Sequence, residues 1–262
     1  THTPWEWHKA SFEEANRLGM IAFSAPFDET AVDLLESLGA PAYKIASPEI
    51  THVPLLKRVA KTGRPVIIST GVAELEDIEL AVATLREGGV KDLVILKCST
   101  AYPAPENETN LRTMHDMKSR FNCLSGLSDH TLGYEVPVLA VASGANVVEK
   151  HFTISEAGET VDSFFSLEAN EFKKMVDAIR RAETILGKVD YSIAPSAKEN
   201  IRGRRSLYIS EKINEREKIS AKNIKTVRPS FGLHPKHFDE VIGRVASRDL
   251  SPGERLSWDA IL

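Results

Sequence analysis

The stretch GLSDHTLG, residues 126–133, places a polar Ser-Asp-His-Thr cluster at the end of an apolar segment. The stretch VVEKHFT, residues 147–153, places a second histidine at the end of the next apolar segment. Neighbouring strands of a sheet lie about 4.8 Å apart, and parallel strands end at the same edge. We therefore expect His130 and His151 to emerge side by side at one edge of a parallel sheet.

Outward from these two stretches, short apolar segments alternate with amphipathic helical patterns, which is typical of a parallel α/β sheet. An open doubly wound sheet and a (β/α)8 barrel both fit the alternation. Polar residues at nearly every strand end favour the barrel, whose active sites use several strand ends. A complete barrel has eight strands, so two more strands are expected before Thr1. The six predicted strands are 20–27, 42–47, 65–70, 92–99, 123–129 and 146–152.

The helical segments carry their own start and stop signals. Asp28 caps the segment that closes at Gly39, as expected for a helix. Leu75, Ile78 and Val82 form one apolar stripe at helical spacing. A further helix is predicted over 168–187. These patterns assign residues 1–187 to one barrel-type domain that is incomplete at its N-terminal side.

The pattern of the sequence changes after Gly187. Residues 188–200 contain Pro and Ser without clear periodicity and are interpreted as a linker. Residues 201–262 contain short strand-like runs and turns, including SPGE at 251–254, and are predicted to form a small, mostly β module.

Composition limits the classes of function. The chain has 262 residues, of which 42% are hydrophobic and 27% charged, as in ordinary globular proteins. Its 33 basic and 37 acidic residues give a formal charge of -4, so nucleic acid is not an expected partner. No apolar run approaches the roughly 20 residues that span a membrane. Cys98 and Cys123 lack metal-type spacing and are interpreted as reduced thiols of a cytoplasmic protein.

Alternation along the strands brings the polar residues of the two opening stretches together. Ser128 and His130 share one face, and so do Glu149 and His151, because side chains two residues apart point the same way. Two imidazoles at adjacent strand ends can bind one Zn- or Mn-type ion and leave most of its coordination shell open. The alternative is that both histidines are structural. Asp129 faces the opposite way, as a helix cap or as a group that orients a ligand.

Other strand ends carry polar residues with two interpretations each. Lys44 is a candidate phosphate-binding cation or a surface lysine with an exposed head group. Ser47, Ser69 and Thr70 are candidate anion donors or helix caps. Tyr102 follows a strand and is either a site residue or a loop tyrosine packed on prolines.

Together these motifs resemble the sialic acid synthase family, the phosphoenolpyruvate-dependent nonulosonic acid synthases. The matching strings, in the family's order, are FSAPFD, YKIAS, PVIISTG, CSTAYPAP, GLSDHT and EKHFT; RRSLY, VRPSFG and GRVASRDLSPGERL resemble its C-terminal antifreeze-like SAF domain. The resemblance implies a TIM barrel, here without its first two strands, followed by a SAF domain. It also implies condensation of phosphoenolpyruvate with an open-chain N-acyl amino sugar, giving a nine-carbon α-keto acid and phosphate.

The resemblance also implies roles for particular residues. His130 and His151 match Mn2+ ligands. Arg228 matches an arginine that one SAF domain inserts into the barrel of the other subunit, which implies a domain-swapped homodimer. Lys44, Glu49 and Glu149 are the expected catalytic residues, with Glu149 steering water or a proton. The remaining matches are Ser47, Ser69 and Ser128, which with Lys44 hold phosphoenolpyruvate, and Tyr102 and Asp162, which with Glu49 and Glu149 form the sugar-side and central polar positions.

Two departures and several alternatives accompany this interpretation. Ala25 stands where the family has a phosphate-side hydroxyl, and the family's first two strands have no counterpart here; a molecule that began at Thr1 would have weak or no activity.

The strings TPWEW, SAPFD and VDSFFSLEA are most similar to the pseudaminic acid branch, and Phe164 or Phe165 could face a deoxy carbon. The neuraminate and legionaminate branches, a metal-dependent aldolase and a carbohydrate-binding protein remain alternatives.

Overall fold

A computed structural model of the chain describes residues 3–154 and 160–262. The chain divides into two compact units, residues 1–187 and 188–262. Each unit has its own hydrophobic core and is considered by itself.

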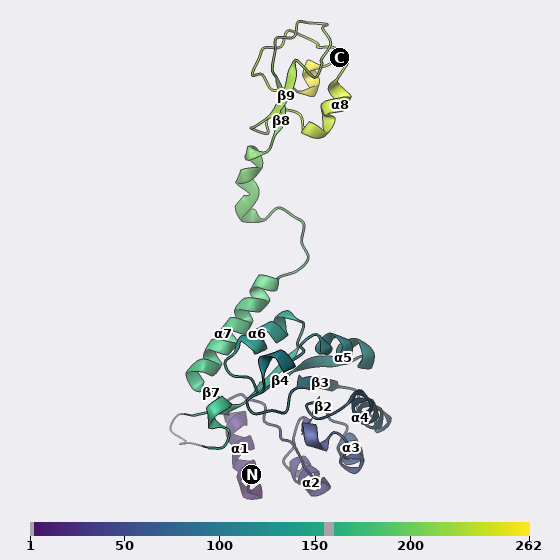
Figure 1. Cartoon of the computed structure of the whole chain (residues 1–262), viewed down its shortest axis with the longest axis vertical. Helices are drawn as coiled ribbons and strands as arrows, with labels where there is room; N and C mark the ends of the chain where they lie inside the picture. Colours follow the sequence, from purple (N-terminus) through teal and green to yellow (C-terminus); the bar gives the residue numbers. More distant parts are fainter. Residues whose placement is uncertain (1–2, 155–159) are drawn as a thin grey trace. The chain divides into compact units, whose positions relative to one another are not determined.

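Five parallel strands in sequential order form the sheet of the first unit. A helix connects each strand to the next, and the helices lie in an arc outside the sheet (Figure 1). The strand order does not reverse, whereas a doubly wound sheet has a switch point where it does. The sequential strand order therefore indicates that the sheet is part of the wall of a TIM-type barrel, and not a doubly wound sheet. The strands are β1 (Tyr43–Ile45), β2 (Val66–Ser69), β3 (Leu93–Cys98), β4 (Leu124–Asp129) and β5 (Val147–Lys150).

The prediction of a strand over residues 20–27 is wrong. Ser24 forms an isolated parallel bridge with Tyr43, and the rest of the segment has no strand pairing. Met20, Ile21 and Phe23 are exposed, so their apolar side chains gain little of the burial that favours an extended strand. Five predicted strands are present, and the sixth is reduced to one bridge.

Helices cover the outer face of the sheet. The predicted Asp28 cap is confirmed, because its Oδ1 accepts a hydrogen bond from Ala31 N–H at 2.8 Å. Ile78 and Val82 are buried as predicted, but Leu75 at the start of its helix is 45% exposed. The helices of this unit are α1 (Trp5–Arg17), α2 (Glu29–Ser37), α3 (Val53–Ala60), α4 (Leu75–Glu87), α5 (Thr113–Phe121), α6 (Glu135–Ala142) and α7 (Ala169–Leu186), with short 3-10 turns η1 (Ser47–Glu49), η2 (Glu106–Glu108) and η4 (Ser163–Phe165).

Alternation along the strands separates an apolar face from a polar one. Tyr43, Ile45, Ile68 and Ile95 are fully buried in the core that the sheet forms with α2, α3 and α4. The residues between them point to the other face, where Lys44 is found. A short parallel pair, β6 (Phe152–Thr153) and β7 (Leu167–Glu168), follows the sheet.

The second unit is small and contains short strands and turns. β8 (Ser206–Ile209) and β9 (Ile224–Val227) pair antiparallel, and four isolated bridges extend this arrangement. Within the predicted linker, residues 188–200, the 3-10 helix η5 (Pro195–Gly203) begins, and it runs past residue 200. The other elements are η6 (Pro235–His237), α8 (Phe238–Val241) and η7 (Trp258–Ala260).

Both cysteines are free: Cys98 is buried and Cys123 partly buried, as predicted for thiols without a disulfide. Over residues 3–154 and 160–262, no helix has the length and apolar character needed to cross a membrane.

Candidate active site

The carboxyl ends of β4 and β5 bring the two opening stretches into contact. Ser128 lies directly opposite Glu149 in the strand register. The Ser128 hydroxyl donates a 2.7 Å hydrogen bond to Glu149 Oε1, on the inner face of the sheet. The pairing follows from the equal spacing of both residues from their histidines.

Lys44 on β1 completes a charged centre. Its ammonium donates to Ser69 Oγ at 2.8 Å and lies 3.3 Å from Glu149 Oε1. The residue is only 9% exposed, so the alternative of a surface lysine is wrong. A positive charge is therefore held between the Ser69 hydroxyl and the Glu149 carboxylate.

The hydroxyls near Lys44 do not cap helices. Ser47 Oγ accepts a hydrogen bond from Gly71 N–H at 2.9 Å. Thr70 Oγ1 donates to the Leu96 carbonyl at 3.1 Å, and Ser69 is bonded to Lys44. Glu74 caps the helix that follows Ser69 and Thr70, and Ala46 and His52 are the N-cap residues of η1 and α3 around Ser47, so the capping alternative for these three residues is wrong.

His130 and His151 lie with their ring centroids 5.2 Å apart, edge to face. His130 Nδ1 is 2.9 Å from the Ser99 carbonyl, and His151 Nδ1 is 4.0 Å from Asp162 Oδ2. Metal-binding histidines commonly hydrogen-bond one ring nitrogen to a carbonyl or carboxylate, as His130 does with the Ser99 carbonyl, and leave the other nitrogen for the ion. The two residues therefore fit a shared cation. No group of three or more His, Cys, Asp or Glu residues arranged to hold a metal occurs among the residues that the structure describes, so other ligands would be water or substrate.

The two imidazoles have different electrostatic surroundings. Burial lowers the pKa of His151, as does nearby His130, and Asp162 and Glu149 oppose the shift only in part. Burial also acts to lower the pKa of His130, but hydrogen bonds to Cys98 and to the Ser99 carbonyl outweigh it and leave that pKa raised. A neutral imidazole is the metal-binding form, so His151 is already suited to an ion near neutral pH.

Aromatic rings form one wall beside the histidines. The Tyr102 ring lies 4.4 Å from that of His130 and 5.3 Å from that of Phe165. Phe165 is buried and its ring lies 4.8 Å from His151, whereas the neighbouring Phe164 is 65% exposed. Tyr102 therefore packs on site residues and remains half exposed to solvent.

Glu49 and Arg228 differ in their relation to this cluster. Glu49 Oε2 is buried without a hydrogen-bond partner. Burial raises the pKa of Glu49, and nearby His52 and Lys44 offset this only partly. Arg228 follows β9 in the second unit, where it is exposed. The structure thus brings together ten of the eleven predicted residues in one unit and leaves Arg228 in the other.

Two residues near the histidines were not expected there. Cys98 Sγ lies 3.8 Å from His130 Nδ1, although its place at a strand end could have indicated this. Lys150 forms a buried ion pair with Asp129, so Asp129 is not a helix cap. The signal for this pair was present, because opposite charges directly precede the two histidines.

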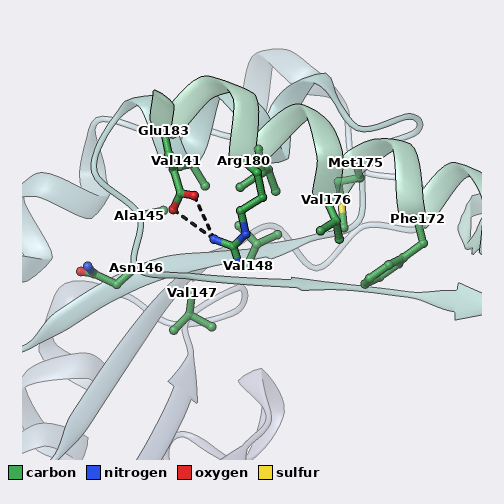
Figure 2. Close-up of a pocket in the computed structure, with 11 residues that line it drawn as sticks. Val141, Ala145, Asn146, Val147, Val148, Phe172, Met175, Val176, Arg180 and Glu183 are labelled. Carbon is green, nitrogen blue, oxygen red and sulfur yellow. Dashed lines mark hydrogen bonds and ion pairs between the residues drawn. The ribbon is translucent and has the colours of Figure 1, made fainter. Parts of the chain in front are cut away.

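A separate groove of about 270 Å³ lies on the outer side of β5. Figure 2 shows Val148 on the side of β5 that faces Met175 and Val176 of α7, with the Arg180–Glu183 ion pair beside them, whereas Val147 points away from the helix. The lining is apolar apart from this exposed helix pair and Asn146, so the groove lacks the reactive groups of the inner face.

Comparison with known proteins identifies the chain's relatives. The NeuB family profile matches residues 1–191, and the SAF domain profile matches residues 204–262. The chain is 43% identical over 254 residues to "Pseudaminic acid synthase" of Campylobacter jejuni, covering 97% of this chain and 74% of the relative. It is 41% identical over 260 residues to the Helicobacter pylori protein of the same name, covering 99% and 76%.

Two further comparisons bear on the branch and the fold. The chain is 38% identical over 250 residues to "N,N'-diacetyllegionaminic acid synthase" of C. jejuni, covering 94% of this chain and 75% of that protein. The crystal structure of N-acetylneuraminic acid synthetase from Leptospira borgpetersenii superposes with a TM-score of 0.71 at 32% identity, over 76% of this chain and 70% of that one. With its parallel barrel wall, its polar strand ends and these matches, the chain belongs to the NeuB family of synthases and carries a SAF domain.

Proposed function

We propose that this protein condenses phosphoenolpyruvate with 2,4-diacetamido-2,4,6-trideoxy-altrose in its open-chain form, giving pseudaminic acid and phosphate. The observation that carries the proposal is the buried Lys44 ammonium, held among hydroxyls beside two converging histidines. The pseudaminic acid synthases of two organisms, 41% and 43% identical over nearly the whole chain, support this choice of product.

The inner face suits an anion such as phosphoenolpyruvate. Lys44 supplies one positive charge at the end of β1, and Ser69 already accepts from it. Ser47 adds a hydroxyl just after the same strand, β1, and Ser128 adds one at the end of β4. An anion that approached Lys44 would compete with Glu149 for the ammonium, because these two groups are 3.3 Å apart. We propose that these four residues hold and orient the phosphate and carboxylate, an effect that lowers the barrier by fixing the reacting geometry.

His130 and His151 would hold a divalent cation, and we propose Mn2+, since imidazole nitrogen suits Mn2+ better than Mg2+. When bound, such a cation supplies Lewis-acid polarisation of the sugar aldehyde. The Ser99 carbonyl lies within hydrogen-bond distance of His130 Nδ1, and the Asp162 carboxylate lies 4.0 Å from His151 Nδ1. We propose that Nε2 of each imidazole binds the ion.

The proposed condensation consumes one water molecule. C3 of phosphoenolpyruvate forms a bond to the aldehyde carbon, and the aldehyde oxygen takes up a proton as a hydroxyl. Water adds at C2 and loses a proton, and phosphate leaves by cleavage of its bond to C2. Glu149, which lies between Ser128 and Lys44, is the proposed group that steers this water or its proton. Glu49, with its raised pKa, is a second candidate proton carrier.

The sugar is proposed to lie along the aromatic wall. Tyr102 and the exposed ring of Phe164 offer apolar surface to a 6-deoxy carbon, while Asp162 offers a carboxylate to sugar hydroxyls or amides. We further propose a domain-swapped homodimer in which each chain supplies its exposed Arg228 to the barrel of the other. The free Cys98 and Cys123 support a reducing, cytoplasmic setting.

The test is phosphate release by the full-length protein from phosphoenolpyruvate, with Mn2+ or with a chelator. Metal-dependent release with the 6-deoxy diacetamido-altrose alone is the expected result. Release only with N-acetylmannosamine or only with the legionaminate precursor would move the protein to that branch. Condensation of the sugar with pyruvate, together with no phosphate release from phosphoenolpyruvate, would indicate an aldolase.

A matched pair of variants separates the enzyme from a carbohydrate-binding protein. His151→Ala is expected to abolish release, whereas His115→Ala, an exposed histidine on α5, leaves it unchanged. Sugar binding that is indifferent to Mn2+ and to His151→Ala, without any phosphate release, would overturn the proposed reaction.

A further inference from the structure

A buried ion pair joins the ends of β4 and β5 on the face away from the histidines. Asp129 and Lys150 lie directly opposite each other in the strand register, and Lys150 Nζ is 2.6 Å from Asp129 Oδ2. The two side chains are 1% and 0% exposed. Surface ion pairs elsewhere in the chain, such as Arg58 with Asp33, retain substantial contact with solvent.

The ion pair involves the residues on both sides of His130 in the sequence: Asp129 is one of its members, and Thr131 is hydrogen-bonded to both members. Thr131 donates its N–H and its hydroxyl to Asp129 Oδ1, at 3.1 and 2.9 Å. The Lys150 ammonium also donates to the Thr131 carbonyl. The residue before His130 and the residue after it are therefore both bound to one ammonium, and that ammonium belongs to the residue just before His151.

Register is the property that these contacts control. A slip of one residue between β4 and β5 would turn Ser128 and His130 away from Glu149 and His151. Two ions lose most of their hydration on burial, so a pair like this one is weak evidence for a gain in stability. A buried ionic pair is more readily explained where it specifies one arrangement, since misaligned strands would leave both charges unpaired.

We propose that Asp129 and Lys150 are positioning residues: they fix the relative placement of the imidazoles of His130 and His151, and hence the affinity for a divalent cation. The inference rests on the proposed function in so far as that function needs a cation between the two rings. It assigns no contact with substrate to either residue, because both side chains lie on the opposite face.

The experiment compares wild type with the double variant Asp129→Asn/Lys150→Met in the full-length protein. Removing both charges together avoids leaving one ion buried alone, and such replacements often preserve folding. The melting temperature reports folding, Mn2+ titration by electron paramagnetic resonance reports affinity, and a nuclear Overhauser effect between the two histidine rings reports their spacing without metal. Arg58→Leu, which removes an ion pair between α2 and α3, is the matched control.

The expected result is a folded double variant that binds Mn2+ roughly 10- to 100-fold more weakly and has lost the contact between the rings, while Arg58→Leu behaves as wild type. A folded double variant with unchanged affinity and an unchanged ring contact would overturn the proposal. Should the double variant not fold, Asp129→Asn removes the ion pair and keeps an oxygen that can accept from Thr131; unchanged affinity and ring contact in that variant would equally overturn it.

Failure of the proposed function is distinguishable from failure of this inference. A wild type that binds Mn2+ but releases no phosphate would refute the reaction and leave the positioning role in place. A wild type that does not bind Mn2+ would refute the cation site and the predicted change in affinity, while the ring contact still decides whether the pair sets the histidine spacing.

Discussion

Gly126 at the start of GLSDHT is the position where one added methyl group should do most harm. A Cβ at this residue would lie 2.2 Å from the Val147 carbonyl oxygen and 2.8 Å from Leu96 Cδ2. Ordinary contacts between carbon and oxygen are about 3.3 Å or longer. The conflict with Val147 is with backbone, which cannot rotate away as a side chain does.

Relief of this contact requires β5 to move away from β4 by about 1 Å. Gly126 pairs with Val147 at the first position of a register that continues to Ser128 with Glu149. The displacement would therefore stretch the same ladder that aligns the polar groups. We expect Gly126→Ala to destabilise the first unit by about 1–3 kcal/mol, which corresponds to a loss of about 2–12 °C in melting temperature.

The assay is differential scanning calorimetry of wild type, Gly126→Ala and a control. Gly203→Ala is the matched control, because a Cβ there would meet nothing within 4 Å and its φ is outside the left-handed region. It is expected to be neutral or slightly stabilising. If Gly126→Ala melted at the wild-type temperature, the close approach of β4 and β5, and the packing argument built on it, would be refuted.

Three other outcomes follow from the site. Glu49→Gln is expected to raise the melting temperature more at pH 8 than at pH 5. The pKa of Glu49 is raised in the folded state, so ionised Glu49 opposes folding increasingly as pH rises above the ordinary glutamate pKa of 4.5; equal shifts at both pH values would contradict this. Phe165→Ala removes a buried ring packed on Tyr102 and His151, and should cost about 3–5 kcal/mol in denaturant unfolding; a cost below about 1 kcal/mol would show that the ring is not core. Lys44→Gln should lower kcat/KM for phosphoenolpyruvate roughly 10- to 150-fold, the equivalent of one charged hydrogen bond, and an unchanged value would remove Lys44 from the anion site.

Much of the barrel wall could be predicted from local pattern. Five of the six predicted strands are present, and α2 begins at its predicted Asp28 cap. These elements depend on residues close in sequence, namely apolar runs, caps and helical periodicity. The strand expected at 20–27 failed because its apolar side chains needed neighbours that its own pattern could not supply.

The candidate site was predictable as a set of positions and not as a set of contacts. Equal spacing from the two strand ends placed Ser128 opposite Glu149, as observed. The same reasoning left Lys44 open between a surface lysine and a buried cation. Its burial depends on Ser69 and Glu149, which are supplied by two other strands.

The sequence by itself determined that strands and helices alternate, that polar residues end the strands, and that His130 and His151 belong to the same kind of position. Those properties follow from local periodicity and from the fixed alternation of side chains along a strand. Three properties were decided only by the tertiary structure. It distinguished a barrel from a doubly wound sheet, it placed Lys44 in the interior, and it paired Asp129 with Lys150. The physical reason is that strand order and desolvation are set by segments distant in the chain. A charge becomes buried and paired only when folding brings its partner from another strand.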